Sequence, residues 1–206
     1  MPRVRHWKLL LFASCFMTLW AAGPLRADSG ATAKVRSVLD KAMEIQTNPS
    51  LQGTSHRKER AGIIRKLIAQ NFLSSEMAKE SLQEYWGRIS ASQRAQYRTL
   101  LTAIFIDSYT RQVVDFLKQE KIQYPGESPE GAFTKVKTVI MRTDEHIPVD
   151  YIMEQSGGKW MIRDVLIDGV GIVETYKSSF ATFLGAHSFS ELIQRMAIQK
   201  RANEGL

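Results

Sequence analysis

Two aspartates are the side chains whose spacing most suggests catalysis. Asp150 and Asp164 fall in two segments that alternate like β-strands on either side of Gly157-Gly158. Carboxylates on neighbouring strands can share a proton and act as an acid–base pair. Alternatively, each pairs with a nearby arginine, Arg142 or Arg163, or holds a loop in place. The sequence favours this second interpretation because it shows no further catalytic group around the two carboxylates.

The other residue types that carry chemistry form no recognisable motif. His56, His146 and His187 belong to three different predicted elements and lack the spacing of metal ligands. Gly158-Lys159 lacks both the earlier glycine and the following Ser or Thr of a phosphate-binding loop. No serine lies in a G-x-S-x-G nucleophile elbow. We therefore expect a protein that is not an enzyme and that uses neither a metal nor a cofactor.

The first 27 residues have the build of a secretory signal peptide. A basic start is followed by the apolar stretch from Leu9 to Ala22, and Ala27 supplies the small residue of a cleavage site. The apolar stretch is shorter than the roughly 20 residues of a membrane span. We expect cleavage after Ala27, which leaves residues 28–206 as one domain; a retained N-terminal anchor is the alternative.

Cleavage would change both the charge and the cysteine content. The full chain has a net charge of +7 and one cysteine, Cys15. Residues 1–27 hold four basic side chains and no acidic one, so 24 Lys and Arg would remain against 21 Asp and Glu, a net charge of +3. The mature chain would have no disulfide and no thiol chemistry.

Such a small positive excess does not favour nucleic acid as a partner. The densest basic segment, from Arg57 to Lys66, is predicted either as a solvated helix face or as a docking patch for an acidic partner or an anionic surface.

Hydrophobic periodicity indicates helices, then strands, then helices again. The predicted helices cover about residues 31–46, 56–72, 74–86, 90–118, 169–183 and 188–201. The predicted strands cover 121–124, 133–142, 145–155 and 160–167, with a loop at 125–129. We predict an α+β fold in which a twisted antiparallel sheet of about four strands packs with several helices around an apolar pocket.

Several helix and turn boundaries are marked by short signals. The segments Ser90 to Gln93 and Ser188 to Glu191 fit capping boxes, in which the serine and the fourth residue satisfy each other's backbone amides. Ser74 or Ser75 is expected to cap the third helix. The pair Gly157-Gly158 fits a primed hairpin turn, which requires positive φ angles.

The predicted strands are apolar on both faces, so each face of the sheet must be covered. Alternation puts Ile162 and Val165 on opposite faces of the last strand. We predict that helices cover one face and that the sheet and the long helix enclose an elongated apolar cavity. The residues expected to line it are Leu82, Tyr85, Leu101, Ile104, Phe105, Val149, Tyr151, Met153, Ile162, Val165, Val170 and Val173.

A run of motifs near the C-terminus points to a family. It contains, in order, Ile147-Pro148-Val149-Asp150-Tyr151, Lys159-Trp160, Asp164-Val165, Ile167, Gly169-Val170-Gly171-Ile172-Val173 and Tyr176-Lys177-Ser178-Ser179-Phe180. This run resembles the MlaC-type (toluene-tolerance) family of periplasmic phospholipid-binding proteins, which typically read IPVDY, KW-x-x-x-DV-x-I-x-GVSLV and YRSQF. Two positions depart from the family pattern: Gly171 replaces a usual serine, and Lys177 replaces a usual arginine.

The resemblance implies a periplasmic carrier that holds phospholipid acyl chains as its cargo. It would move lipid between the outer membrane and an inner-membrane ABC transporter, and so support outer-membrane lipid asymmetry. Its partners would be that transporter complex and an outer-membrane lipoprotein–porin complex. Lys177 offers a point charge in place of a bidentate guanidinium, which leaves a hopanoid-like lipid as an alternative cargo. The remaining alternative is a periplasmic enzyme or scaffold that uses Asp150 and Asp164.

Overall fold

Seven α-helices and a five-stranded antiparallel sheet make up residues 30–203, which are the residues that the computed structural model describes. The predicted signal peptide and Cys15 lie outside them. The helices are α1 (Gly30–Thr47), α2 (Arg57–Asn71), α3 (Ser74–Leu82), α4 (Tyr85–Arg88), α5 (Ala91–Phe116), α6 (Ile172–Leu184) and α7 (Phe189–Asn203), with a short 3₁₀ helix η1 (Pro49–Leu51). The α+β prediction is confirmed.

The sheet runs in chain order from β1 to β5, with every neighbouring pair antiparallel. Its strands are β1 (Lys121–Glu130), β2 (Phe133–Met141), β3 (His146–Ser156), β4 (Lys159–Ile167) and β5 (Val170–Gly171). Gly157 and Gly158 take φ angles of +58° and +75° at the turn between β3 and β4, as the sequence predicts.

Two strand predictions need correction. The expected loop at 125–129 belongs to β1, whose pairing with β2 shifts between Gln123 and Gly126. A bulge at an edge strand accommodates Pro125, which has no N–H to donate. Asp168-Gly169 was expected to lead straight into a helix, but it first makes a tight turn into β5.

Local capping signals place the starts of two helices, α5 and α7. Both capping boxes are present: Gln93 N–H donates to the Ser90 hydroxyl at 3.2 Å, and Glu191 N–H donates to the Ser188 hydroxyl at 3.3 Å. The predicted serine cap of α3 is wrong, because Leu73 holds the N-cap position. Leu73 N–H instead donates to the carbonyl of Ile162 at 2.8 Å, a long-range contact that fixes the start of α3 against β4.

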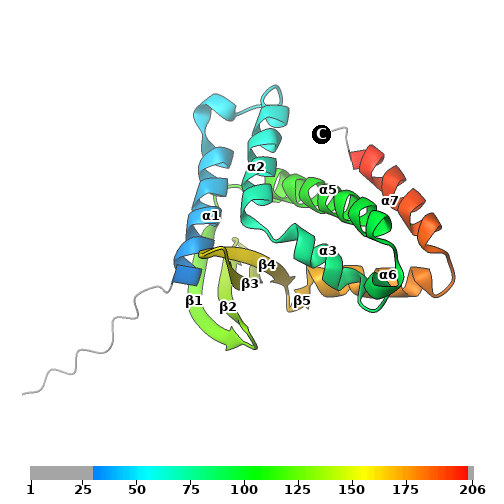
Figure 1. Ribbon diagram of the computed structural model, residues 1–206. Helices are drawn as coiled ribbons and strands as arrows, with labels where there is room; N and C mark the ends of the chain where they lie inside the picture. Colours follow the sequence, from blue (N-terminus) through cyan, green and yellow to red (C-terminus); the bar gives the residue numbers. More distant parts are fainter. Residues whose placement is uncertain (1–29, 204–206) are drawn as a thin grey trace, which may run out of the picture.

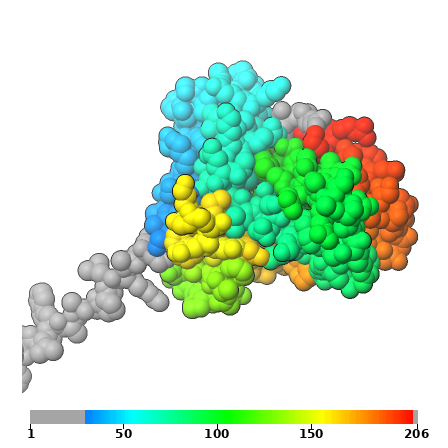
Figure 2. All heavy atoms as spheres, viewed as in Figure 1, coloured from blue at the N-terminus to red at the C-terminus, as the bar shows by residue number. Residues whose placement is uncertain are grey.

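The helices pack in two groups that share α5 (Figure 1). One apolar cluster joins α1, α2, the sheet and the first turn of α6 with the C-terminal half of α5, and Met77 of α3 belongs to it as well. The other joins α3, α6 and α7 with the N-terminal half of α5. In the space-filling view, cyan α2 stands above the yellow β3–β4 hairpin, with green α5 beside them (Figure 2). Within residues 30–203, no helix is both long and apolar enough to cross a bilayer.

The basic segment of α2 is partly used inside the fold. Arg57 pairs with Asp115 at 2.6 Å and Arg65 pairs with Asp107 at 2.8 Å, so both arginines tie α2 to α5. Arg60 donates to the carbonyl of Leu51. These contacts hold α2 in place, and a docking role for the segment stays a prediction.

Candidate functional site

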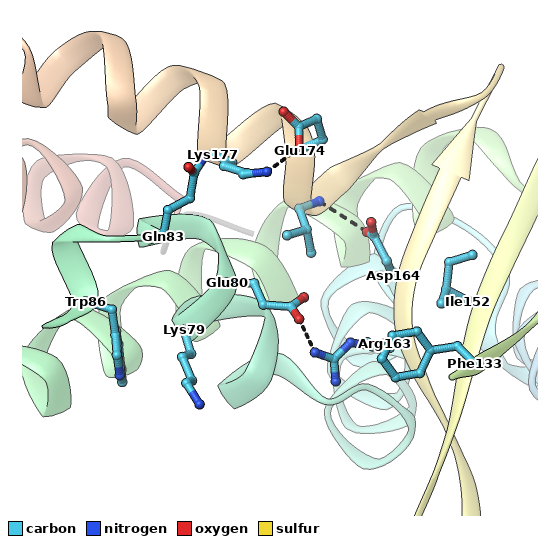
Figure 3. Close-up of a pocket in the computed structure, with 11 residues that line it drawn as sticks. Lys79, Glu80, Gln83, Trp86, Phe133, Ile152, Arg163, Asp164, Glu174 and Lys177 are labelled. Atoms are coloured by element: carbon cyan, nitrogen blue, oxygen red, sulfur yellow. Dashed lines mark hydrogen bonds and ion pairs between the residues drawn. The ribbon is translucent and has the colours of Figure 1, made fainter. Parts of the chain in front are cut away.

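A cleft of about 570 Å³ opens between α3, β4 and the start of α6 (Figure 3). Its apolar surface comes from four elements and its remaining surface is polar or charged. The apolar residues are Trp86 of α4, Phe133 of β2, Ile152 of β3 and Val173 of α6. The polar and charged residues are Lys79, Glu80, Gln83, Arg163, Asp164, Glu174 and Lys177.

Arg163 reaches this cleft because β4 contains a β-bulge. The partner of Ile152 is Asp164, and the next residue of β3 pairs two positions away, with Ile162. Arg163 is thus an extra residue of β4, and such a residue breaks the alternation of side chains. Arg163 and Asp164, although adjacent in sequence, therefore both line the cleft.

The bulge also decides which residues of β4 are buried. The expectation that Ile162 and Val165 lie on opposite faces is wrong, because the extra residue shifts the alternation by one position. Both are buried, against the core face of β3. The cleft lies on the other face, where Ile152 stands opposite Asp164.

The guanidinium of Arg163 is held by two carboxylates and one ring. It forms ion pairs with Glu80 of α3 and Glu154 of β3, and its central carbon lies 4.5 Å from the centre of the Phe133 ring. Burial opposes the charge, but the hydrogen bonds with the two carboxylates outweigh it and raise the pKa of Arg163 above its ordinary value. Arg163 therefore stays charged inside the cleft wall.

The carboxylate of Asp164 is engaged by the backbone. Its Oδ1 accepts the N–H groups of Val165 at 2.8 Å and Val173 at 3.1 Å. Burial raises the pKa of Asp164, and the backbone hydrogen bonds act against that rise. Asp164 thus holds the connection between β4 and α6, one of the structural roles that the sequence suggested.

The structure does not assemble the acid–base pair. Asp150 stands opposite Leu166 in the sheet, two positions from Asp164, and it is not among the residues that line the cleft. The suggested arginine partners are wrong as well. Arg163 pairs with Glu80 and Glu154, and Arg142 pairs with Glu120 and Glu145. Within residues 30–203, no group of three His, Cys, Asp or Glu side chains is arranged to hold a metal ion.

Comparison with known proteins decides the family. The model of the MlaC protein family matches residues 36–197. The chain belongs to the MlaC family. The phospholipid-binding protein from Ralstonia solanacearum, solved in complex with a phospholipid, has the same fold, with a TM-score of 0.71. It is 19% identical in sequence, and the match covers 86% of this chain and 99% of that chain. Among curated proteins, no sequence gives a significant match.

The sequence-predicted pocket residues of this MlaC-family chain separate into three groups. Val173 lines the cleft, while Leu82 and Tyr85 line a small groove of about 50 Å³ beside it. Val170 is 61% exposed on β5. The others are buried in the packed clusters, to which Leu82 and Val173 also belong: Leu101, Ile104, Phe105, Val149, Tyr151, Met153, Ile162 and Val165. Lipid contact by any of them stays a prediction.

Sequence reasoning missed most of the charged cleft residues. Lys79 and Glu80 lie on a helix whose position against β4 depends on long-range contacts. Arg163 could not be selected either, because only the structure shows that Ile162 and Val165, three positions apart, are both buried against one face, a spacing that breaks strand alternation. Such a break is typical of a bulge.

Proposed function

We propose that this chain binds a phospholipid, with the acyl chains against the apolar part of the cleft and the phosphate near its cations. The observation that carries the proposal is one cleft whose lining combines apolar side chains, including Phe133 and Ile152, with three cations. The cations are Lys79, Arg163 and Lys177, and the carboxylates Glu80, Asp164 and Glu174 line the cleft beside them. Membership of the MlaC family and the fold shared with a protein solved with a phospholipid support this assignment.

The apolar clusters behind the cleft would provide the apolar surroundings that acyl chains need. Each methylene that moves from membrane to water costs about 0.8 kcal/mol, so two long chains cost roughly 20 kcal/mol or more. A carrier offsets this cost only by surrounding the chains with apolar side chains. In the loaded protein, the chains would extend from Ile152 and Val173 between the two packed clusters, among the buried residues that the sequence predicted.

We further propose that the protein carries its lipid through the periplasm. The signal-like sequence of residues 1–27 supports export. The expected partners are an inner-membrane ABC transporter and an outer-membrane lipoprotein–porin complex. The sequence shows no nucleotide-binding motif, so energy for directional transfer would come from the transporter.

The test is native mass spectrometry of the gently purified protein and of two matched variants. Val173→Trp fills the cleft, whereas Val114→Trp overpacks a buried valine of α5 outside it. Overpacking costs about 1–3 kcal/mol at either site. Wild type and Val114→Trp are expected to retain a phospholipid-sized mass, and Val173→Trp is expected to lose it. Equal lipid in both variants contradicts the cleft assignment, and a hopanoid-sized mass in wild type identifies the other cargo.

A further inference from the structure

The two carboxylates that hold Arg163 come from different parts of the fold. Glu154 lies on β3, the strand paired with β4, so its ion pair with Arg163 stays within the sheet. Glu80 lies on α3, 83 positions away in sequence, so its ion pair crosses the cleft and joins α3 to the sheet (Figure 3). The Glu80–Arg163 pair is therefore a tie between two walls of the cleft.

This tie also connects the two packed clusters. Helix α3 contributes Ala78 and Leu82 to one cluster and Met77 to the other, in which Ile162 of β4 also packs. At its start, α3 is fixed to β4 by the hydrogen bond from Leu73 N–H to the Ile162 carbonyl. The Glu80 tie lies two turns further along the helix. Loosening it would remove the side-chain tie between the sheet and α3, while Ala78, Leu82 and the Ser81–Tyr97 hydrogen bond keep α3 packed on the helices of the opposite wall.

The chemistry of the tie permits exchange with a phosphate. The Arg163 side chain is 14% exposed, while Glu80, at 40%, is more exposed than Glu154, at 30%. A guanidinium binds phosphate in the same forked geometry as a carboxylate. An anion that enters the cleft therefore meets a charged group that is already oriented, and Glu80 is the partner that water can most readily solvate on release.

We propose that Arg163 recognises the phosphate of the bound lipid and that this phosphate takes the place of Glu80. The exchange breaks the Glu80 tie between the α3 wall and the sheet, so that recognition of the head group lets the two walls part and widens the entrance for the acyl chains. The inference rests on the proposed function and adds the residue that selects the cargo. The ligand chemistry is a phosphate ester carried on apolar chains.

The first experiment compares two substitutions that remove one negative charge each. Wild type, Glu80→Gln and Glu154→Gln are incubated with vesicles of equal phosphatidylglycerol and diacylglycerol that share the same acyl chains. Lipid on the re-isolated protein is measured over time by native mass spectrometry. Glu80→Gln is expected to load several-fold faster than wild type, because its tie is already open. Glu154→Gln is expected to stay within about twofold of wild type, because α3 remains tied.

The second experiment tests recognition. Wild type is expected to take phosphatidylglycerol over diacylglycerol by about tenfold, the size expected of a charge-assisted hydrogen bond. Arg163→Gln is expected to lose this preference, and Arg163→Lys, which keeps the charge without the fork, is expected to lose most of it. Lys137→Gln, an exposed position on β2 outside the cleft, controls for the change in charge and should keep the preference. If the Arg163 variants fail to fold, the comparison of Glu80→Gln with Glu154→Gln still tests the proposed exchange.

Each outcome tests either the phosphate exchange at Arg163 or the proposed lipid binding itself. Equal loading of Glu80→Gln and Glu154→Gln, or lipid binding without preference for phosphate, overturns the inference and leaves lipid carriage intact. Uptake of neither lipid by wild type overturns the proposed function itself. Inorganic phosphate alone is expected to leave the melting temperature unchanged. A rise that Arg163→Gln lacks would assign the site to free phosphate and overturn its assignment to lipid.

Discussion

Asp164 caps α6 from the neighbouring strand, since its Oδ1 accepts the N–H of Val173 at 3.1 Å. The N-cap position of α6 belongs to Gly171, which has no side chain to offer. The first N–H groups of a helix have no partner within it, so a nearby oxygen must satisfy them. Asp164 supplies that oxygen from β4 and fixes α6 against the sheet at the edge of the cleft.

Removal of this cap should destabilise the protein, and the loss should be larger when no acceptor oxygen remains at position 164. Asp164→Ala is expected to cost about 1–2 kcal/mol of unfolding free energy, as loss of a helix cap usually does. Asp164→Asn is expected to cost less, because its amide oxygen can still accept from Val173. Urea unfolding of the three proteins measures the difference. Equal stability of the alanine variant and wild type would show that the contact contributes nothing.

The same carboxylate predicts a dependence on pH. Burial raises the pKa of Asp164 above its ordinary value of 3.8, so the folded state binds the proton more tightly than the unfolded state does. This group therefore adds stability as the pH falls through the folded pKa toward 3.8, and that stability is lost as the pH rises.

The measurement is urea unfolding of wild type and Asp164→Asn between about pH 7 and about pH 4. Wild type should gain stability relative to the asparagine variant as the pH is lowered. The reverse trend would mean that the hydrogen bonds from Val165 and Val173 outweigh burial.

Gly171 is expected to be intolerant of a side chain because the Asp164 carboxylate lies beside it. A Cβ at this position would lie 2.8 Å from Oδ2 of Asp164. Its φ of −72° suits any residue, so only this contact resists substitution. Gly171→Ala should therefore lower stability by displacing the cap, whereas Gly62→Ala, inside α2 with nothing within 4 Å, should raise it by about 0.5–1 kcal/mol.

A double-mutant cycle checks the cause of the Gly171 effect. When Asp164 is already alanine, Gly171→Ala should cost less than it does in wild type, because the carboxylate that it displaces is gone. If the two substitutions change the stability additively in thermal or urea unfolding, the residues act independently and the steric explanation is contradicted.

The parts of the fold that the sequence predicts correctly depend on neighbouring residues. The capping box at Ser90 and the turn at Gly157-Gly158 are satisfied within a few positions, so their residue types are sufficient to identify them. The helix periodicity of α5 is likewise local, because one face of the helix carries its apolar residues.

The errors arise where distant segments determine the geometry. The bulge at Arg163 cannot be read from strand alternation, which assumes that every residue of β4 has a partner. The start of α3 depends on the hydrogen bond from Leu73 to Ile162, across 89 positions in the sequence. The cleft lies where these two long-range features meet, so its charged residues could not be selected from local patterns.

A buried hydrogen bond between α3 and α5 gives an asymmetric prediction. The hydroxyls of Ser81 and Tyr97 lie 2.6 Å apart, and Ser81 also donates to the carbonyl of Ala78 at 2.9 Å. Because serine has one proton, Tyr97 must be the donor between the two hydroxyls. Burial raises the pKa of Tyr97, so it keeps the proton that it donates.

Ser81→Ala should therefore cost more stability than Tyr97→Phe. The first leaves the buried Tyr97 hydroxyl without an acceptor, which costs about 1–3 kcal/mol. The second leaves Ser81 still bonded to Ala78 and keeps the ring, so a loss below about 1 kcal/mol is expected. Chemical unfolding of both variants and of the double variant measures the order. A larger loss for Tyr97→Phe would reverse the donor assignment, because the serine would then be the group left unsatisfied.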